Sequence, residues 1–273
     1  MKRILIVAFL VSCSINAKAQ DFVIVGKDSI EYTKTGQGQP WIILVSGLGG
    51  GIHSYDTIVE SLSDHSTVIR YSRAGLSQST YNIDNKSFTS IMNEMDGFLK
   101  AIDAPDSIVL VGHSYAGLMI RAYAKEHPEQ VKGLVSLDPT FEDYFPVLEE
   151  FHPNARELEV KGIDSTVRKI IVDEVNSLLG IWNSPDEWEK LLTYNKEIPH
   201  FCISSMKAYP SRELRSTVEI MQARYDAHER IVNTSNVHMH LSLPQAGHGI
   251  QWDAPNITID TILLMLDMIR NQE

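Results

Sequence analysis

Three residues of the types that carry out acyl transfer follow one another along the chain in the order serine, aspartate, histidine. Ser114 lies in "IVLVGHSYAG", Asp138 ends "GLVSLD", and His248 lies in "LSLPQAGHG". A serine hydroxyl is a weak nucleophile, so it needs a base within hydrogen-bond reach and a third group that orients the base. This order matches one of the known arrangements of a Ser-His-Asp triad.

The residues around Ser114 favour a sharp turn that would expose its hydroxyl. Gly112 lies two positions before the serine, but Ala116 stands two positions after it, where a second glycine is expected, and Gly117 follows. One extra methyl group is a small departure, and we expect a slightly tighter turn. The motif alone does not separate a nucleophile from a small residue in an ordinary strand-to-helix junction.

Apolar segments of strand length alternate with helical ones along most of the chain, and helices are expected over 53–63 and 87–102. The first two strands resemble a hairpin pair. Such alternation predicts an α/β domain, with a mostly parallel sheet covered on both faces and ligands bound at the carboxyl ends of the strands. The predicted strands are 22–25, 29–36, 41–47, 65–72, 107–112, 131–138, 200–206 and 237–244.

The interval 141–198 interrupts this alternation. An apolar stripe predicts a helix that ends at Gly180, and a second helix is expected to begin with Ser184 as its N-cap and Glu187 closing a capping box. Two helices without a strand between them suggest a helical cap inserted over the sheet. The core domain would then comprise 20–140 and 199–273.

The first 19 residues have the layout of a secretory signal peptide. Lys2 and Arg3 precede an apolar stretch that is too short to span a bilayer, and an A-x-A site ends at Ala19. We therefore expect an exported protein, periplasmic or secreted, with no transmembrane span. An alternative is "LVSC", which resembles a bacterial lipoprotein processing site and would make Cys13 a lipid anchor.

Composition excludes several other classes. The chain has 24 basic and 35 acidic residues, a net charge of -11, which repels phosphate backbones, so no nucleic-acid partner is expected. Cleavage after Ala19 would leave Cys202 as the only cysteine. That excludes an intramolecular disulfide and a cysteine-based metal site.

Taken together, these segments resemble the α/β-hydrolase fold family over nearly the whole mature chain. The similarity is carried by "SGLGG", "YSRAGLSQS", "GHSYAG", "GLVSLDPT" and "AGHGIQWDAP". The resemblance implies an eight-stranded, mostly parallel sheet with a cap after the sixth strand. It also implies Ser114 as the nucleophile, His248 as general base and then acid, and no metal or cofactor.

The acidic partner of His248 is less clear from the resemblance. In many relatives it follows the seventh strand, but "HFCISSMKAYPSREL" offers no aspartate there. Asp138, after the sixth strand, occupies the position that some relatives use, and Glu213 is the alternative. Asp138 could instead cap the turn before Pro139.

Acyl transfer also requires donors for the developing oxyanion. The resemblance implies the backbone amides of Tyr115 and Leu48. "SGLGGG" is similar to the family's His-Gly-x-Gly pattern, with Ser46 in place of the histidine. A dinucleotide site is not favoured, because this loop does not complete G-x-G-x-x-G.

The sequence therefore predicts a secreted or periplasmic serine hydrolase that cleaves an ester or related acyl bond of a small molecule through an acyl-serine intermediate. Two alternatives remain open: an aminopeptidase specific for N-terminal proline on the same fold, and a non-catalytic binding protein. The cap and the loops shape the pocket, so the sequence leaves the substrate open.

Overall fold

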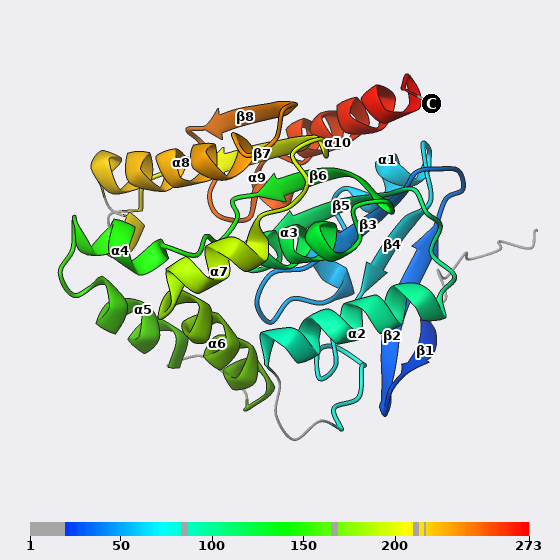
Figure 1. Ribbon diagram of the computed structural model, residues 1–273, viewed down its shortest axis with the longest axis horizontal. Coiled ribbons are helices and arrows are strands. Elements are labelled where there is room, and N and C mark those ends of the chain that lie inside the picture. The colour runs from blue at the N-terminus through cyan, green and yellow to red at the C-terminus, as the bar shows by residue number, and fades with distance from the viewer. Residues whose placement is uncertain (1–19, 83–86, 165–168, 210–212, 216, 273) are drawn as a thin grey trace, which may run out of the picture.

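The computed structural model describes residues 20–82, 87–164, 169–209, 213–215 and 217–272. Its centre is one sheet of eight strands in the order β1-β2-β4-β3-β5-β6-β7-β8 (Figure 1). β1 and β2 are antiparallel to their neighbours, whereas the remaining pairs are parallel. The predicted fold class is confirmed. The strands are β1 (Asp21–Val25), β2 (Asp28–Thr35), β3 (Trp41–Val45), β4 (Val68–Tyr71), β5 (Ile108–His113), β6 (Val131–Leu137), β7 (His200–Ser205) and β8 (His238–Leu243).

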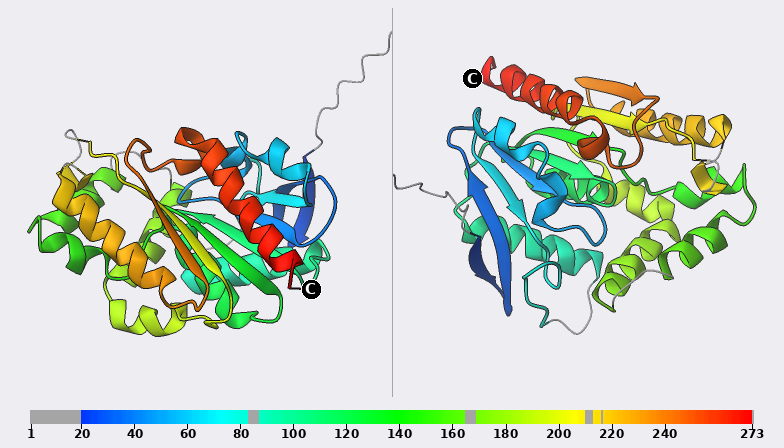
Figure 2. Two further views of the ribbon diagram at one scale, coloured as in Figure 1. Left: turned by 90° about the horizontal axis from the view of Figure 1, so that it is seen from above. Right: turned by 180° about the vertical axis from the view of Figure 1, so that it is seen from behind.

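Both faces of the sheet are apolar because its central strands are covered on both sides. In β3, Ile43 and Val45 join one buried cluster, whereas Ile42 and Leu44 join the other. Three helices pack on the first face: α2 (Phe88–Ala101), α3 (Ala116–Glu126) and α8 (Val218–Val232). The second face is covered by α1 (Val59–Ser63), α9 (Ile250–Asp253) and α10 (Pro255–Arg270), and a short 3-10 helix, η1 (Ile52–Tyr55), follows β3 (Figure 2).

Four helices lie in the described part of the chain between β6 and β7, and we call them the cap helices. They are α4 (Tyr144–Glu149), α5 (Ala155–Asp164), α6 (Lys169–Trp182) and α7 (Pro185–Leu192). Several of them lie beyond the carboxyl ends of β6 and β8, which the arrowheads mark (Figure 1). The sequence predicted only two helices here, because α4 is short and α5 is mostly polar. The division of the chain into core and cap stays a prediction.

Two details predicted for this interval are wrong. α6 does not end at Gly180 but continues to Trp182. Gly180 is exposed and a Cβ there would meet nothing within 4 Å, so this glycine is simply tolerated within the helix. Ser184 does precede α7, but its side chain accepts no capping hydrogen bond. Glu187 instead donates its backbone N–H to the Ser184 carbonyl at 3.1 Å, so the capping box is not formed.

The N-terminal segment 1–19, including Cys13, lies outside the described residues. None of the helices that the structure does describe combines the length and the apolar character needed to cross a bilayer.

One histidine of the core is held without charge. His200 is fully buried at the start of β7, and its two ring nitrogens lie 2.7 Å from the Ser136 hydroxyl and 2.7 Å from the Tyr194 hydroxyl. Burial is the main reason that the pKa of His200 is lowered to about 3.

We expect the free energy of unfolding to fall as the pH is lowered from about 6.5 toward 3. Over that range His200 binds a proton in the unfolded chain but stays neutral in the folded protein. His200 therefore lowers the free energy of unfolding by about 1.4 kcal/mol for each pH unit. Urea unfolding measured at several pH values checks this expectation. His200→Gln should reduce the slope, and the exposed His65→Gln should not. Equal slopes for native protein and His200→Gln would contradict it.

Candidate active site

A strained turn presents Ser114 at the end of β5. Its φ is 54°, in the left-handed region that residues with a side chain rarely adopt. The backbone is fixed on both sides of the turn: Ser114 N–H donates to the Leu137 carbonyl at 3.0 Å, and the Ser114 carbonyl accepts from Gly117 at 2.8 Å and Thr140 at 2.9 Å. These bonds offset the strain and fix the backbone of the turn that carries the hydroxyl.

The glycines beside Ser114 are required by close backbone contacts. A Cβ on Gly112 would lie 2.7 Å from the carbonyl oxygen of Ala116, and a Cβ on Gly117 would lie 2.4 Å from the Cβ of Pro139. Ala116 itself is fully buried at the start of α3. The chain therefore tolerates alanine at 116 but needs glycine at 117, where the segment after β6 passes.

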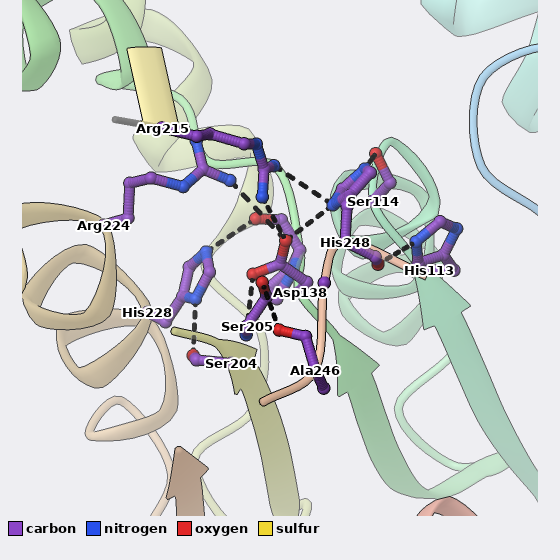
Figure 3. A network of polar contacts seen from close by, with 12 residues as sticks. His113, Ser114, Asp138, Ser204, Ser205, Arg215, Arg224, His228, Ala246 and His248 are labelled. Carbon is purple, nitrogen blue, oxygen red and sulfur yellow. Dashed lines mark hydrogen bonds and ion pairs between the residues drawn. The ribbon is translucent and has the colours of Figure 1, made fainter. Parts of the chain in front are cut away.

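Ser114, His248 and Asp138 form a continuous hydrogen-bonded chain (Figure 3). His248 Nε2 lies 2.9 Å from Ser114 Oγ, and His248 Nδ1 lies 2.6 Å from Asp138 Oδ2. Asp138 is fully buried, and its Oδ1 accepts the backbone N–H of Ser205 at 3.1 Å. With Nδ1–H donating to the carboxylate, Nε2 presents its lone pair to the serine hydroxyl, which is the arrangement that a general base needs.

The loop that carries His248 is held from two sides. Gly247 N–H donates to Asp253 Oδ2 at 2.7 Å, and His113 Nε2 lies 2.8 Å from the His248 carbonyl. Burial lowers the pKa of His113 below its ordinary value, so this ring is neutral and donates through Nε2. The loop is therefore fixed to His113, the residue that precedes Ser114.

Two arginines contact the inner part of this chain. Arg215 Nη1 lies 3.2 Å from Asp138 Oδ2, and Arg224 Nη2 lies 3.7 Å from the same oxygen. Burial by itself would raise the pKa of Asp138, but the Arg215 guanidinium, the bond to His248 and Arg224 together hold it well below its usual value. Asp138 is therefore ionised across the working range of most enzymes.

Arg215 also contacts His248, with its Nη2 3.2 Å from Nδ1. Since Nδ1 already carries the proton donated to Asp138, this contact brings a cation against the ring without a second hydrogen bond. Burial, followed by the Arg215 charge, lowers the pKa of His248 from its ordinary value. The side chain keeps 34% of its surface exposed, so it remains accessible from solution.

Two backbone amides are available beside Ser114. Among the described residues, the N–H groups of Leu48 and Tyr115 have no hydrogen-bond acceptor, although both residues line the same cavity as Ser114. The loop of Leu48 passes close to the serine: a Cβ on Gly47 would lie 3.2 Å from Ser114 Cβ. Both amides predicted for the oxyanion therefore belong to backbone beside Ser114.

A buried ion pair holds the loop that contains Leu48. The Arg73 guanidinium donates to the carbonyls of Ser46 at 2.6 Å and Gly47 at 2.7 Å, and its Nε lies 2.6 Å from Glu174 Oε1. Glu174, from α6, is fully buried and also accepts the Gly49 N–H at 3.0 Å. A cap helix and the core thus share one charged contact at this loop.

Ser114 opens into a cavity of about 380 Å³ between the sheet edge and the cap helices. Trp182 of α6 lies on the wall of this cavity. Its ring stacks on that of Tyr144, with the two ring centroids 4.5 Å apart. The lining residues are Gly47, Leu48, Gly50, Ser54, His113, Ser114, Tyr115, Thr140, Tyr144, Glu159, Leu178, Trp182, Arg215, Arg224, His248 and Trp252.

The alternative acid, Glu213, belongs to a short 3-10 helix, η2 (Glu213–Arg215). Its side chain lies outside the described part of the structure, whereas Asp138 lies directly against His248.

Sequence reasoning missed four charged residues at this site. They are Arg73, Glu174, Arg215 and Arg224. No motif contains them as a set, because Arg73 and Glu174 are 101 residues apart and Arg215 is 77 residues from Asp138. The "YSRAG" segment carried Arg73 but did not reveal its role.

One group of potential metal ligands lies near the site, formed by Cys202, His228 and His240. Their ring nitrogens already have partners: His228 Nδ1 and His240 Nε2 each lie 2.7 Å from the Ser204 hydroxyl, His228 Nε2 lies 2.8 Å from a backbone carbonyl, and His240 Nδ1 lies 2.5 Å from Glu229. Burial also raises the pKa of the Cys202 thiol. The two histidines are therefore held by hydrogen bonds to other residues of the protein.

Several known proteins resemble this chain. The Bacillus subtilis protein YqjL is 22% identical over 220 residues, which cover 79% of each chain. A proline iminopeptidase of Saccharolobus solfataricus is 30% identical over 97 residues, 34% of this chain and 31% of that one. A thermophilic esterase from Thermogutta terrifontis superposes with a TM-score of 0.64 and 17% identity, covering 92% of this chain and 99% of that chain, which shows a shared fold.

The family model of the alpha/beta hydrolase fold matches residues 40–182. That range includes the loop of Leu48, the turn at Ser114 and Asp138, and it is more than half of the 273 residues. The sheet order and the position of the cap helices agree with this match. The chain therefore belongs to the α/β-hydrolase fold family.

Proposed function

We propose that this protein is a serine hydrolase that cleaves an ester or related acyl bond of a small molecule through an acyl-serine intermediate. The observation that carries the proposal is the unbroken chain from Ser114 Oγ through His248 to Asp138, with contacts of 2.9 and 2.6 Å. It opens into a cavity of about 380 Å³, within the range of small-molecule sites.

In the first half of the reaction, His248 Nε2 takes the hydroxyl proton while Ser114 Oγ bonds to the carbonyl carbon. The negative charge moves to the carbonyl oxygen, where the amides of Leu48 and Tyr115 donate to it; a single donor of this kind is worth about 3 to 4 kcal/mol. The tetrahedral intermediate then collapses, and His248 gives its proton to the leaving alcohol or amine.

In the second half, water attacks the acyl-serine and His248 takes its proton. The intermediate collapses again, the acid is released, and Ser114 Oγ recovers the proton from His248. Asp138 stabilises the imidazolium in both halves without taking its proton.

The two alternatives are less favoured by the cavity. A peptidase that binds a substrate ammonium group needs carboxylates in its wall. Arg215 and Arg224 line this cavity instead, and Glu159 is the one carboxylate among its described lining residues. A binding protein has no need of a serine held at a strained φ with a base 2.9 Å away. We therefore favour a carboxylesterase-like activity.

Export through residues 1–19 is part of the proposal, with lipidation at Cys13 as the alternative. Mass spectrometry of the protein purified from its native host distinguishes them. Cleavage after Ala19 leaves an unmodified N-terminus, whereas lipoprotein processing leaves a lipidated Cys13.

Labelling with a fluorophosphonate probe tests the nucleophile directly. We expect stoichiometric modification of native protein at Ser114, no labelling of Ser114→Ala, and full labelling of Ser54→Ala, a cavity serine outside the hydrogen-bonded chain. Hydrolysis of p-nitrophenyl esters of graded chain length, beside proline and alanine amides, then defines the acyl preference. Native protein that neither labels nor cleaves any ester would sink the proposed function.

A further inference from the structure

A buried arginine in the cavity wall, Arg224, has two donors without a hydrogen-bond partner in the part of the chain that the structure describes. Arg224 is only 3% exposed and lines the same cavity as Ser114. Its Nε and Nη1 are buried and have no hydrogen-bond partner among the described residues, while Nη2 makes the 3.7 Å contact with Asp138. Leaving a charged donor unpaired in this way is costly, and native proteins normally satisfy such groups.

The second guanidinium of the wall lies beside the first. Arg215 and Arg224 both approach Asp138 Oδ2, so one carboxylate, already bonded to His248, faces two cations (Figure 3). Asp138 can neutralise only one of them. One positive charge in this part of the cavity therefore has no counter-ion from Asp138.

Among the lining residues that the structure describes, Glu159 from α5 is the one carboxylate. Its Oε2 accepts the Tyr144 hydroxyl at 3.1 Å, and no ion pair within 4.0 Å joins it to either arginine. Tyr144 lies between them, with the Arg224 Cζ 5.5 Å from its ring centroid. The cavity therefore keeps unpaired donors in a chain whose net charge is -11, which would otherwise repel anions.

We propose that Arg224 and Arg215 bind a carboxylate carried by the substrate, so that the esters this enzyme prefers are monoesters of dicarboxylic acids or similar acidic esters. This inference rests on the proposed function. A guanidinium matches the planar carboxylate in both shape and charge. A singly charged carboxylate also suits this wall better than a doubly charged phosphate, which Glu159 on the same wall would repel more strongly.

Two substrates of equal length test this selectivity. Mono-p-nitrophenyl glutarate and p-nitrophenyl valerate differ only in a terminal carboxylate or methyl group. We expect native protein to have a kcat/KM at least about tenfold higher for the glutarate monoester, the value of one charge-assisted hydrogen bond. A ratio of one or less would overturn the inference.

Replacement of the arginine should remove the preference. Arg224→Met is expected to lower the glutarate-to-valerate ratio at least about tenfold. Arg230→Met is the matched control, because Arg230 lies on the same helix but its side chain is 55% exposed and pairs with Asp143. An unchanged ratio in folded Arg224→Met would contradict the assignment of this residue.

Inhibition of the native protein needs no variant and separates the two oxyanions. Free glutarate should compete with p-nitrophenyl valerate more strongly than inorganic phosphate does, and stronger inhibition by phosphate would overturn the choice of carboxylate. Hydrolysis of the valerate ester and fluorophosphonate labelling require no anion. Their failure would sink the proposed function, whereas their success without a preference for glutarate would sink only the carboxylate site.

Discussion

Asp138→Asn is expected to lower kcat by about 10⁴-fold, the scale seen when a triad aspartate is replaced by asparagine. The asparagine amide can present an N–H to His248 Nδ1, and that would favour the tautomer with the proton on Nε2. His248 could then no longer accept the proton of Ser114. The substitution also removes the negative charge that Arg215 and Arg224 share, so a loss of stability is expected beside the loss of activity.

Glu213→Gln is the matched comparison, because Glu213 is the other acid that the sequence offered. We expect its kcat to stay within about threefold of native, because Asp138 already supplies the carboxylate that contacts His248. Steady-state hydrolysis of a p-nitrophenyl ester is measured for both variants, with thermal unfolding to separate stability from chemistry. A large loss at Glu213 together with near-native turnover of Asp138→Asn would reverse the assignment of the acid.

Glu174→Ala is expected to destabilise the protein by about 3 to 5 kcal/mol, because it leaves the buried Arg73 guanidinium without its carboxylate. Both side chains are almost fully buried, at 1% and 0% exposure, so water cannot replace the lost partner. The Gly49 N–H also loses its acceptor, and the loop that carries Leu48 is loosened. The midpoint of thermal unfolding should fall by roughly 10 °C, with a lower kcat in the remaining folded protein.

Asn176→Ala is the control for this experiment, since Asn176 is exposed on the same helix, α6. It should change stability by less than about 0.5 kcal/mol. The double variant Arg73→Met, Glu174→Leu removes both charges together and should recover most of the stability lost in Glu174→Ala. Equal losses in the single and double variants would show that packing, and not the unpaired charge, is responsible.

The sequence alone predicted most of the sheet, because strand formation follows local apolar runs. All eight predicted strands are present, each within a few residues of its expected bounds. It was weakest in the cap helices, where α4 is short and α5 lacks a clear apolar stripe. The sequence also predicted that a helix ends at Gly180. In the structure this helix continues to Trp182, because Ile181 and Trp182 are both buried against the rest of the protein.

The order of Ser114, Asp138 and His248 could be interpreted from sequence for a related reason. Each residue follows a predicted strand, and the carboxyl ends of parallel strands meet at one edge of a sheet. Adjacency of β5 and β6 and of β7 and β8 then brings the three side chains to that edge. The three side chains share one edge because the strands are parallel, and the alternation of strands and helices in the sequence predicted a parallel sheet.

Only the tertiary structure showed which charged side chains surround this site. Arg73 meets Glu174 across 101 residues, and Arg215 meets Asp138 across 77. Such contacts depend on the direction of single side chains from helices whose packing angles no local pattern encodes. "IVLVGHSYAG" thus determined a serine at the tip of a strand, whereas the fold determined the two guanidiniums beside Asp138 and the ion pair that holds the Leu48 loop.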